Sequence, residues 1–295
     1  MGDLKWTKRQ HGNRFRGPEA SWIIWNTGRR KSSGMETRNG RKSMQINTDG
    51  LIVKEQNIGE SDRLVTVLTR KEGILRAFVR GAKRMKSRNA SSTQLLCYSR
   101  LSIYKGRDTY VIDEAQPEEV FFPLRQDMEK LSLAQYFCEL SISLAPENAE
   151  AGDFLRLVLN GLYFLSSGKR PASLIKAVVE MRMLSLAGYM PDLIYCQDCG
   201  AYEADEMYFL PRQGTLYCGD CYRKAQRSHG IAMNRGVTTA LRHTIYADFS
   251  KLFAFSLPEE GRKRLAYLSE CYLLSQLDRQ FATLQFYHQI FPECS

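Results

Sequence analysis

In the sequence Gly73-Ile-Leu-Arg-Ala-Phe-Val-Arg-Gly-Ala-Lys83, apolar residues alternate with basic or aromatic residues from Leu75 to Arg80. One face of this alternation is apolar and the other is basic and aromatic: the first holds Leu75, Ala77 and Val79, and the second holds Arg76, Phe78 and Arg80. A period of two residues is that of a β-strand with one buried face. The stretch therefore predicts a strand that packs apolar side chains into a core and presents cations and an aromatic ring outward.

Similar short runs, separated by turn residues, surround this strand. The expected strands cover residues 45–54, 63–69, 74–81, 95–104 and 109–114. Five strands in so short a segment are typical of a small barrel or sandwich. The fourth run is also two-faced, with Leu101 and Ile103 opposed to Tyr98, Arg100, Ser102 and Tyr104. Because bases stack on rings and phosphates need positive charge, such a face suits single-stranded nucleic acid.

A basic segment, Arg80-Gly-Ala-Lys-Arg-Met-Lys-Ser-Arg88, joins the third and fourth of these runs. It has five basic residues in nine positions and no acidic residue, and we expect it to form a loop. An isolated basic run is often only a solvated surface. We favour contact with phosphate, because the segment continues directly from the basic and aromatic strand face.

The apolar periodicity changes near residue 120 from that of a strand to that of a helix. Helical spacing follows over residues 133–144, 154–165, 174–187, 234–245 and 259–280. Two helical blocks flank a cysteine-rich segment, and we expect them to pack together as one all-α domain. The predicted fold class is therefore α+β and multidomain, with an N-terminal β-barrel and a helical domain that carries the cysteine segment as an insertion.

Two Cys-x-x-Cys pairs, Cys196-Gln-Asp-Cys199 and Cys218-Gly-Asp-Cys221, are separated by eighteen residues. A hairpin over 207–210 and 215–217 can bring them together, and this interval is typical of a zinc ion held by four thiolates. Two redox dithiols or four unconnected buried thiols are the alternatives, and the doubled pattern favours the metal. Since four thiolates fill a tetrahedral ion, we expect one structural Zn²⁺ without a position for substrate.

Positive charge is concentrated at the start of the chain. Residues 1–43 have 11 Lys and Arg against 3 Asp and Glu, which is +8 of the total net charge of +10. This segment is either a disordered basic arm that adds DNA affinity or upstream sequence translated from a start codon placed too early. We favour the second, because the strand pattern begins abruptly at Met44. The expected organisation is an extension at 1–43, a barrel at 44–118, helical parts at 119–194 and 234–295, and a zinc module at 195–233.

Catalytic patterns are not found in this sequence. The four histidines are scattered, and residues 166–170 resemble a phosphate-binding loop only superficially, because their Lys is followed by Arg. We therefore expect a protein that is not an enzyme. No run approaches the roughly 20 apolar residues that span a bilayer, so we expect a cytoplasmic, nucleoid-associated protein without a membrane partner.

Four features can be taken together. They are Gly59-Glu-Ser-Asp-Arg-Leu-Val-Thr-Val-Leu-Thr69, the 73–83 stretch, Ser185-Leu-Ala-Gly-Tyr-Met-Pro-Asp192 and the four cysteines. In this order and spacing they resemble the RecO family of bacterial recombination mediators, over essentially all of residues 44–295. The resemblance implies an OB-fold, a helical domain and a zinc module.

The resemblance also implies a function. Members of the family would bind single- and double-stranded DNA, anneal complementary strands and act with RecR and RecF to load RecA onto strands coated by SSB, whose acidic C-terminal tail docks on the helical domain. By position, the resemblance assigns seven basic residues to the DNA surface: Arg63, Arg76, Arg80, Lys83, Arg84, Lys86 and Arg88. Strand alternation adds three aromatic residues: Phe78, Tyr98 and Tyr104.

Two other classes of protein compete with this interpretation. One is a zinc-ribbon and OB-fold protein that binds RNA, since both modules also serve RNA recognition. A preference for structured RNA, without strand annealing, would favour it. The other is an enzyme that uses zinc or a bound nucleotide, which requires an open metal position or a true phosphate-binding loop.

Overall fold

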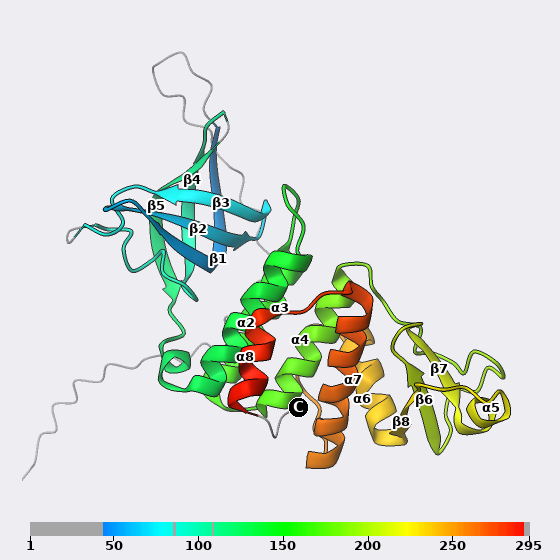
Figure 1. Cartoon of the computed structure of the whole chain (residues 1–295). Helices are drawn as coiled ribbons and strands as arrows, with labels where there is room; N and C mark the ends of the chain where they lie inside the picture. Colours follow the sequence, from blue (N-terminus) through cyan, green and yellow to red (C-terminus); the bar gives the residue numbers. More distant parts are fainter. Residues whose placement is uncertain (1–43, 85–86, 108, 292–295) are drawn as a thin grey trace, which may run out of the picture. The chain divides into compact units, whose positions relative to one another are not determined.

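The computed structural model describes residues 44–84, 87–107 and 109–291 (Figure 1). The expectations for residues 1–43 and for Lys86 therefore lie outside the described residues. Within these ranges, no helix is both long enough and apolar enough to cross a bilayer.

Five strands close into a barrel. They are β1 (Met44–Ile58), β2 (Asp62–Thr69), β3 (Gly73–Val79), β4 (Tyr98–Lys105) and β5 (Tyr110–Glu119). The order around the barrel is β1-β2-β3-β5-β4, with β3 and β5 parallel and β1 closing the barrel against β4. A five-stranded barrel of this kind is OB-like. The barrel that the sequence predicts is confirmed.

The barrel has an apolar interior of its own. Alternate residues of β3 and β4 contribute to it, and all are buried: Leu75, Ala77, Val79, Leu101 and Ile103. On the outer side of β3, Arg76 is exposed and Phe78 is half-buried, and Arg80 is exposed just after the strand ends. The two-faced pattern predicted for this stretch is therefore confirmed.

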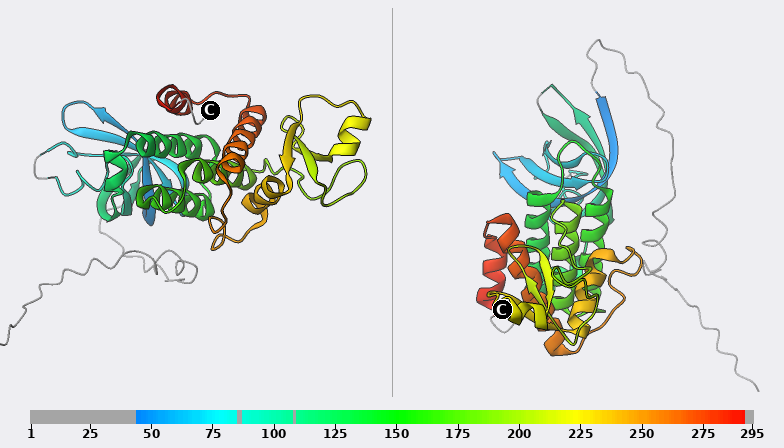
Figure 2. Two further views of the ribbon diagram at one scale, coloured as in Figure 1. Left: turned by 90° about the horizontal axis from the view of Figure 1, so that it is seen from below. Right: turned by 90° about the vertical axis from the view of Figure 1, so that its right-hand side faces the viewer.

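Helices form the second part of the fold. They are η2 (Phe122–Gln126), α2 (Met128–Leu144), α3 (Gly152–Ser167), α4 (Ala172–Leu186), α6 (Arg235–Tyr246), α7 (Glu259–Leu277) and α8 (Ala282–Ile290). α4 packs against α3, α6 and α7, and α2 packs against α8. Figure 2 shows the helices of the first block (green) beside those of the second (orange and red). The two helical blocks thus pack together, as the sequence predicts.

Helix α8 is absent from the sequence prediction, which expects one helix over 259–280. Helix α7 ends at Leu277, because Asp278 adopts a left-handed conformation with φ 43°. The chain then turns, and α8 buries Leu284 and Tyr287. α8 is short, with nine residues and two buried positions, and the sequence prediction misses it because it does not break the last helix at Asp278.

The cysteine segment forms a small sheet between α4 and α6. Its strands are β6 (Glu206–Leu210), β7 (Thr215–Cys218) and β8 (Ile231–Asn234), and α5 (Gly219–Lys224) follows β7. β6 lies between the other two strands and pairs antiparallel with both. The predicted hairpin corresponds to β6 and β7. β8 is an addition, and it leads directly into α6.

Backbone hydrogen bonds join the barrel to the helices. The Ile74 N–H donates to the Pro146 carbonyl at 2.8 Å, and the Ala151 N–H donates to the Arg70 carbonyl at 2.9 Å. Gly73 has a φ of +63°, and an added Cβ would lie 1.9 Å from the Pro146 carbonyl oxygen. A side chain at position 73 would therefore separate the β2–β3 turn from the α2–α3 connection.

Candidate metal centre and nucleic-acid interface

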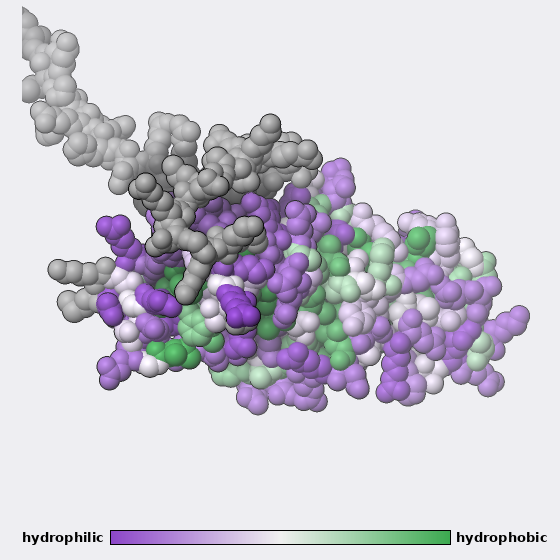
Figure 3. Space-filling view, turned by 90° about the horizontal axis from the view of Figure 1, so that it is seen from above, coloured by the Kyte–Doolittle hydropathy of each residue, from purple (hydrophilic) through white to green (hydrophobic). Residues whose placement is uncertain are grey.

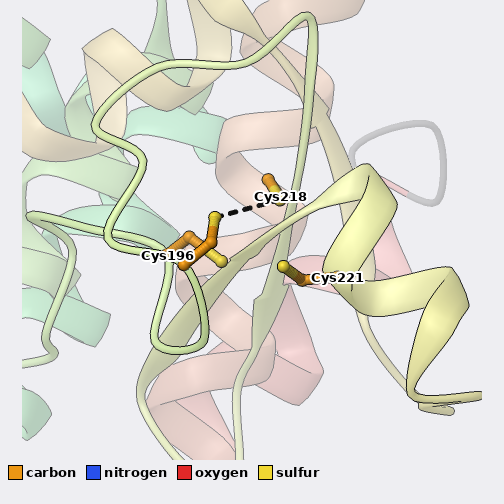
Figure 4. A group of neighbouring side chains, drawn as sticks. Cys196, Cys218 and Cys221 are labelled. Atoms are coloured by element: carbon orange, nitrogen blue, oxygen red, sulfur yellow. Dashed lines mark hydrogen bonds between the residues drawn. The ribbon is translucent and has the colours of Figure 1, made fainter.

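The four cysteines of the two Cys-x-x-Cys pairs converge. Cys196 and Cys199 lie on the turn before β6, Cys218 ends β7 and Cys221 lies in α5. Their sulfur atoms all lie within 4.8 Å of one another, and the Cys199 and Cys218 sulfurs are 3.7 Å apart. In Figure 4 the side chains of Cys196, Cys218 and Cys221 gather around a common point. The structure thus brings together all four residues that the sequence assigns to a metal.

The spacing of these sulfurs fits one metal ion. Four thiolates at about 2.3 Å from a tetrahedral ion are about 3.8 Å from one another. The loop between Cys196 and Cys199 is closed by a hydrogen bond from the Gly200 N–H to the Cys196 carbonyl at 2.9 Å, and Gly200 takes the left-handed conformation that this turn needs. The four cysteines can therefore bind a single metal ion and fill its coordination.

The surroundings of Cys196 favour its thiolate form. Burial raises the pKa of this thiol. Backbone N–H groups of Cys218, Cys199 and Asp198 lower the pKa by more than burial raises it, and the resulting pKa is about 7. A thiolate is the form of cysteine that binds metals. The backbone around Cys196 thus favours its thiolate, whereas neighbouring cysteine side chains raise the pKa of Cys199 and that of Cys221.

Aromatic residues that the sequence analysis does not single out support the metal centre. The rings of Tyr208 and Tyr222 are stacked at 3.9 Å, and the Tyr222 hydroxyl accepts a hydrogen bond from the Gly230 N–H at 2.9 Å. The Arg227 guanidinium lies 4.0 Å from the Tyr217 ring and donates to Asp198, next to Cys199. No local sequence pattern predicts these contacts, because the partners meet only when the sheet has formed.

The second candidate site is on the outer face of the barrel. We define the basic loop as residues 80–88, which follow β3. The described cations of β3 and this loop are all exposed: Arg76, Arg80, Lys83, Arg84 and Arg88. In the part of the chain that the structure describes, none of them has a hydrogen bond or salt bridge from its side chain. By contrast, Arg70 and Arg100 of the barrel pair with Asp49 and Glu118.

A row of apolar and aromatic side chains runs beside these cations. Phe78 is the neighbour of Val111 in the β3–β5 pairing, and Val111 is the neighbour of Tyr104 in the β4–β5 pairing. Tyr104 is 44% exposed, and the other two are half-buried. Figure 3 shows, on the face drawn there, small hydrophobic patches (green) among hydrophilic side chains (purple). Two of the three predicted aromatic residues, Phe78 and Tyr104, thus lie on the same outer surface.

Tyr98 does not lie on that surface, and the expectation that it is exposed is wrong. It is 3% exposed, and its hydroxyl donates to Asp49 at 2.6 Å. The β4–β5 register shifts between Tyr98 and Ser99, so that both residues are buried and the simple alternation breaks there. A register shift depends on the partner strand, which the sequence of β4 does not contain.

Arg63 also differs from the exposed cations. Its side chain is 11% exposed and lies 3.4 Å from Glu55. It donates to the Ala90 carbonyl at 3.1 Å and to the Thr93 hydroxyl at 3.3 Å. The Arg63 guanidinium is therefore engaged within the barrel, and its assignment to the DNA surface stays a prediction.

Two family models match the chain. The model described as "Recombination protein O N terminal" matches residues 44–121, and the one described as "Recombination protein O C terminal" matches residues 125–285. The first covers the barrel, and the second covers α2 to α7, the cysteine sheet and the start of α8.

Individual relatives agree with these matches. The DNA repair protein RecO of Acetivibrio thermocellus is 33% identical over 241 residues, which cover 82% of this chain and 95% of that protein. The DNA repair protein RecO of Symbiobacterium thermophilum is 26% identical over 243 residues, with 81% and 95% covered. That of Heliobacterium modesticaldum is 33% identical over 203 residues, with 67% and 72% covered.

Proposed function

The chain belongs to the recombination protein O family, and on this premise we propose that it is a DNA repair protein that acts by binding DNA rather than by catalysis. The observation that carries this proposal is the group of exposed, unpaired cations on β3 and the basic loop. A phosphate backbone binds to such groups and releases its counterions when it does so. Cations already paired with carboxylates would not serve, because binding would first have to break those pairs.

The row formed by Phe78, Val111 and Tyr104 supports single-stranded DNA as a ligand. Unpaired bases can stack on exposed rings, whereas a duplex hides its base faces. The second half of β5 is acidic, and its exposed Asp113 and Glu114 line one groove with Arg80, Arg84 and Arg88. Since carboxylates repel phosphate, we propose that the DNA follows β3 and the basic loop and keeps away from the β5 side of this groove.

We propose zinc as the metal of the cysteine cluster, with a structural role. Four thiolates select a soft or borderline ion and leave no position for substrate. Metal analysis of the purified protein should find one zinc per chain. Substitution of Cys199 and Cys221 by Ser should abolish zinc retention and expose the cysteine segment to proteolysis, because structural metal binding and folding are coupled. Iron in place of zinc, or full retention by the double variant, would contradict this assignment.

The finer function that we propose follows the family. The protein binds single- and double-stranded DNA, anneals complementary strands and, with RecR and RecF, helps to load RecA on strands coated by SSB, whose C-terminal tail the helical domain would bind. It would act at the nucleoid. Neutralisation of two strands by one basic surface supports annealing, because it removes the repulsion between their phosphates.

The main experiment is a titration of a labelled mixed-sequence oligonucleotide, followed by anisotropy over a series of salt concentrations. The chain and a variant with Arg80, Lys83, Arg84, Lys86 and Arg88 changed to Ala are compared, each with and without residues 1–43. The variant of residues 44–295 should bind at least about 100-fold more weakly. Its salt slope, the slope of log K against the logarithm of salt concentration, should become about three to four less steep, since each lost phosphate contact with a single strand removes about 0.7 from this slope.

A matched control removes five exposed cations elsewhere: Arg212, Lys224, Lys251, Lys263 and Arg264. It loses the same charge, and its affinity should change much less. Equal losses in both variants would show that net charge alone drives binding. Binding that requires residues 1–43 would move the DNA site to that segment, and tighter binding of structured RNA than of single-stranded DNA would favour the RNA-binding alternative.

A further inference from the structure

The start of the basic loop is held by the turn between β1 and β2. The Asp62 carboxylate accepts a hydrogen bond from the Gly81 N–H at 2.8 Å, and the Ser61 carbonyl accepts one from the Lys83 N–H at 3.0 Å. Gly81 has a φ of +63°, a conformation that favours glycine. The Ser61 hydroxyl donates to the same Asp62 oxygen at 3.1 Å and so helps to orient it. The first turn of the basic loop is therefore held by hydrogen bonds to the β1–β2 hairpin.

The end of the loop is held by β5. The side-chain oxygen of Asn89 accepts from the Ala115 N–H at 3.1 Å, and its amide nitrogen donates to the Asp113 carbonyl at 2.9 Å. Among the described residues, the partner strand β3 pairs with β5 only at Tyr110 and Val111. Asn89 thus ties the end of the loop to backbone groups of β5 beyond the part that pairs with β3.

Arg63 reinforces the same end. It donates to the Ala90 carbonyl and to the Thr93 hydroxyl, and that hydroxyl donates to the Asn89 carbonyl at 2.6 Å. Three consecutive residues of the β1–β2 turn and β2, Ser61, Asp62 and Arg63, therefore contact both ends of the segment that contains the basic loop. They belong to the Gly59–Thr69 stretch on which the family resemblance rests, and none of them adds an exposed cation.

We propose that Asp62 and Asn89 are positioning residues that hold the two ends of the basic loop, so that the cations near these ends, Arg80, Lys83, Arg84 and Arg88, meet a phosphate backbone from an anchored main chain. This inference rests on the proposed function. A loop without such anchors would lose conformational entropy on binding, and this loss would weaken the complex.

The charge of Asp62 supports a positioning role. The Gly81 N–H and the Ser61 hydroxyl, together with Arg84 and Arg80 nearby, lower the pKa of this carboxyl, so that it is ionised at neutral pH. A carboxylate beside a phosphate-binding loop repels the ligand. Its electrostatic effect on DNA affinity is therefore unfavourable, and its benefit must come from the hydrogen bond to Gly81.

Two substitutions at Asp62 separate these effects, and the oligonucleotide titration measures both in the full chain. Asp62→Ala removes the repulsive charge and the hydrogen-bond acceptor, and we expect affinity to fall about fivefold. Asp62→Asn removes the same charge but keeps a side-chain oxygen, and we expect affinity at least equal to that of the parent chain. Glu60→Ala is the matched control, because Glu60 is exposed and makes no hydrogen bond or salt bridge in the described part of the chain. It should bind slightly more tightly.

A second readout tests the anchors without DNA. Tryptic cleavage within residues 80–88 and hydrogen exchange at the Gly81 amide should both accelerate in Asp62→Ala and remain near the parent rates in Asp62→Asn. Asn89→Ala should accelerate cleavage from the other end and also weaken DNA binding, and it tests the proposal if Asp62→Ala does not fold.

Parent-like or tighter DNA binding by Asp62→Ala and Asn89→Ala, with unchanged cleavage, would overturn the inference. If the parent chain does not bind DNA, the proposed function fails, whereas the cleavage and exchange rates still decide whether Asp62 and Asn89 order the loop.

Discussion

Lys176 in α4 and the cations of the basic loop carry the same charge in opposite surroundings. The Lys176 side chain is 2% exposed, and its ammonium lies 2.9 Å from Glu180 and 2.7 Å from Glu270. The described cations of the basic loop, Arg80, Lys83, Arg84 and Arg88, are exposed and have no such partners in the described ranges. Because desolvation is costly, a buried charge needs partners, whereas an exposed one can remain unpaired in water. The contrast separates charge that orders the protein from charge that is available to a ligand.

The buried ion-pair group of Lys176, Glu180 and Glu270 connects several helices of the helical domain. Glu180 also accepts hydrogen bonds from the Tyr136 hydroxyl of α2 at 2.8 Å and from the Ser269 hydroxyl of α7 at 2.5 Å. Glu270 lies 2.9 Å from His288 of α8. Burial by itself lowers the pKa of Lys176, but Glu180 and Glu270 raise it above its usual value. Lys176 therefore stays charged, and the network joins α2, α4, α7 and α8.

The largest effect is expected from Glu180→Ala, which leaves Lys176 buried with a single carboxylate. Removal of one partner of a buried ion pair costs about 3–5 kcal/mol. Urea unfolding should show this loss, and DNA affinity should not change if the two groups of charges are independent. Glu180→Gln keeps one of the two side-chain oxygens that accept from Tyr136 and Ser269, and it should lose less. A loss below about 1 kcal/mol in Glu180→Ala would show that water replaces the missing carboxylate.

Phe78→Ala should weaken binding of single-stranded DNA by about 1–3 kcal/mol, because it removes a ring on which a base can stack. Its salt slope should stay unchanged, since no phosphate contact is lost, and this separates it from the loss of loop cations. Anisotropy over a salt series measures both quantities. A fall in slope equal to that of the loop variant would show that Phe78 acts only by ordering the neighbouring cations.

Tyr98→Phe tests the ring that strand alternation places wrongly on the outer face. Loss of the hydrogen bond to Asp49 should cost about 1 kcal/mol of unfolding free energy. Because Phe keeps the ring, affinity for DNA should match that of the parent chain, in contrast to Phe78→Ala. An unfolding free energy equal to that of the parent chain would contradict the role given to this hydrogen bond.

The smallest effect concerns the dependence of stability on pH. Burial tends to raise the pKa of Glu270, but Lys176 and His288 lower it below its usual value of 4.5. A lowered folded-state pKa contributes stability that is present above 4.5 and is lost as the pH falls through the folded value. Glu270→Gln should therefore flatten the loss of stability between about pH 5 and pH 3 by less than about 1 kcal/mol. An unchanged profile would assign acid unfolding to other carboxylates.

Several features of this protein follow from local sequence. The alternation of Leu75, Ala77 and Val79 with Arg76 and Phe78 predicts the β3 strand and both of its faces, because the period of a strand is a property of the chain itself. The two Cys-x-x-Cys pairs predict the four-cysteine cluster for a similar reason, since the spacing of the sulfurs within each pair is set by a short turn. The helices with wide apolar stripes, such as α3, are predicted as well.

The tertiary structure decided the rest, because the relevant partners are distant in the sequence. Tyr98 is buried through the register of β4 against β5, and α8 depends on the surface of α2. Arg63 is a cation like those of the basic loop, but its Nη1 donates to Ala90 and Thr93. No local sequence pattern assigns Asp62 or Asn89 to the basic loop, because their partners Gly81 and Ala115 are distant in the sequence. The sequence by itself thus determined which elements form and which cysteines meet, whereas only the packing of strands and loops decided which polar side chains remain free for a ligand.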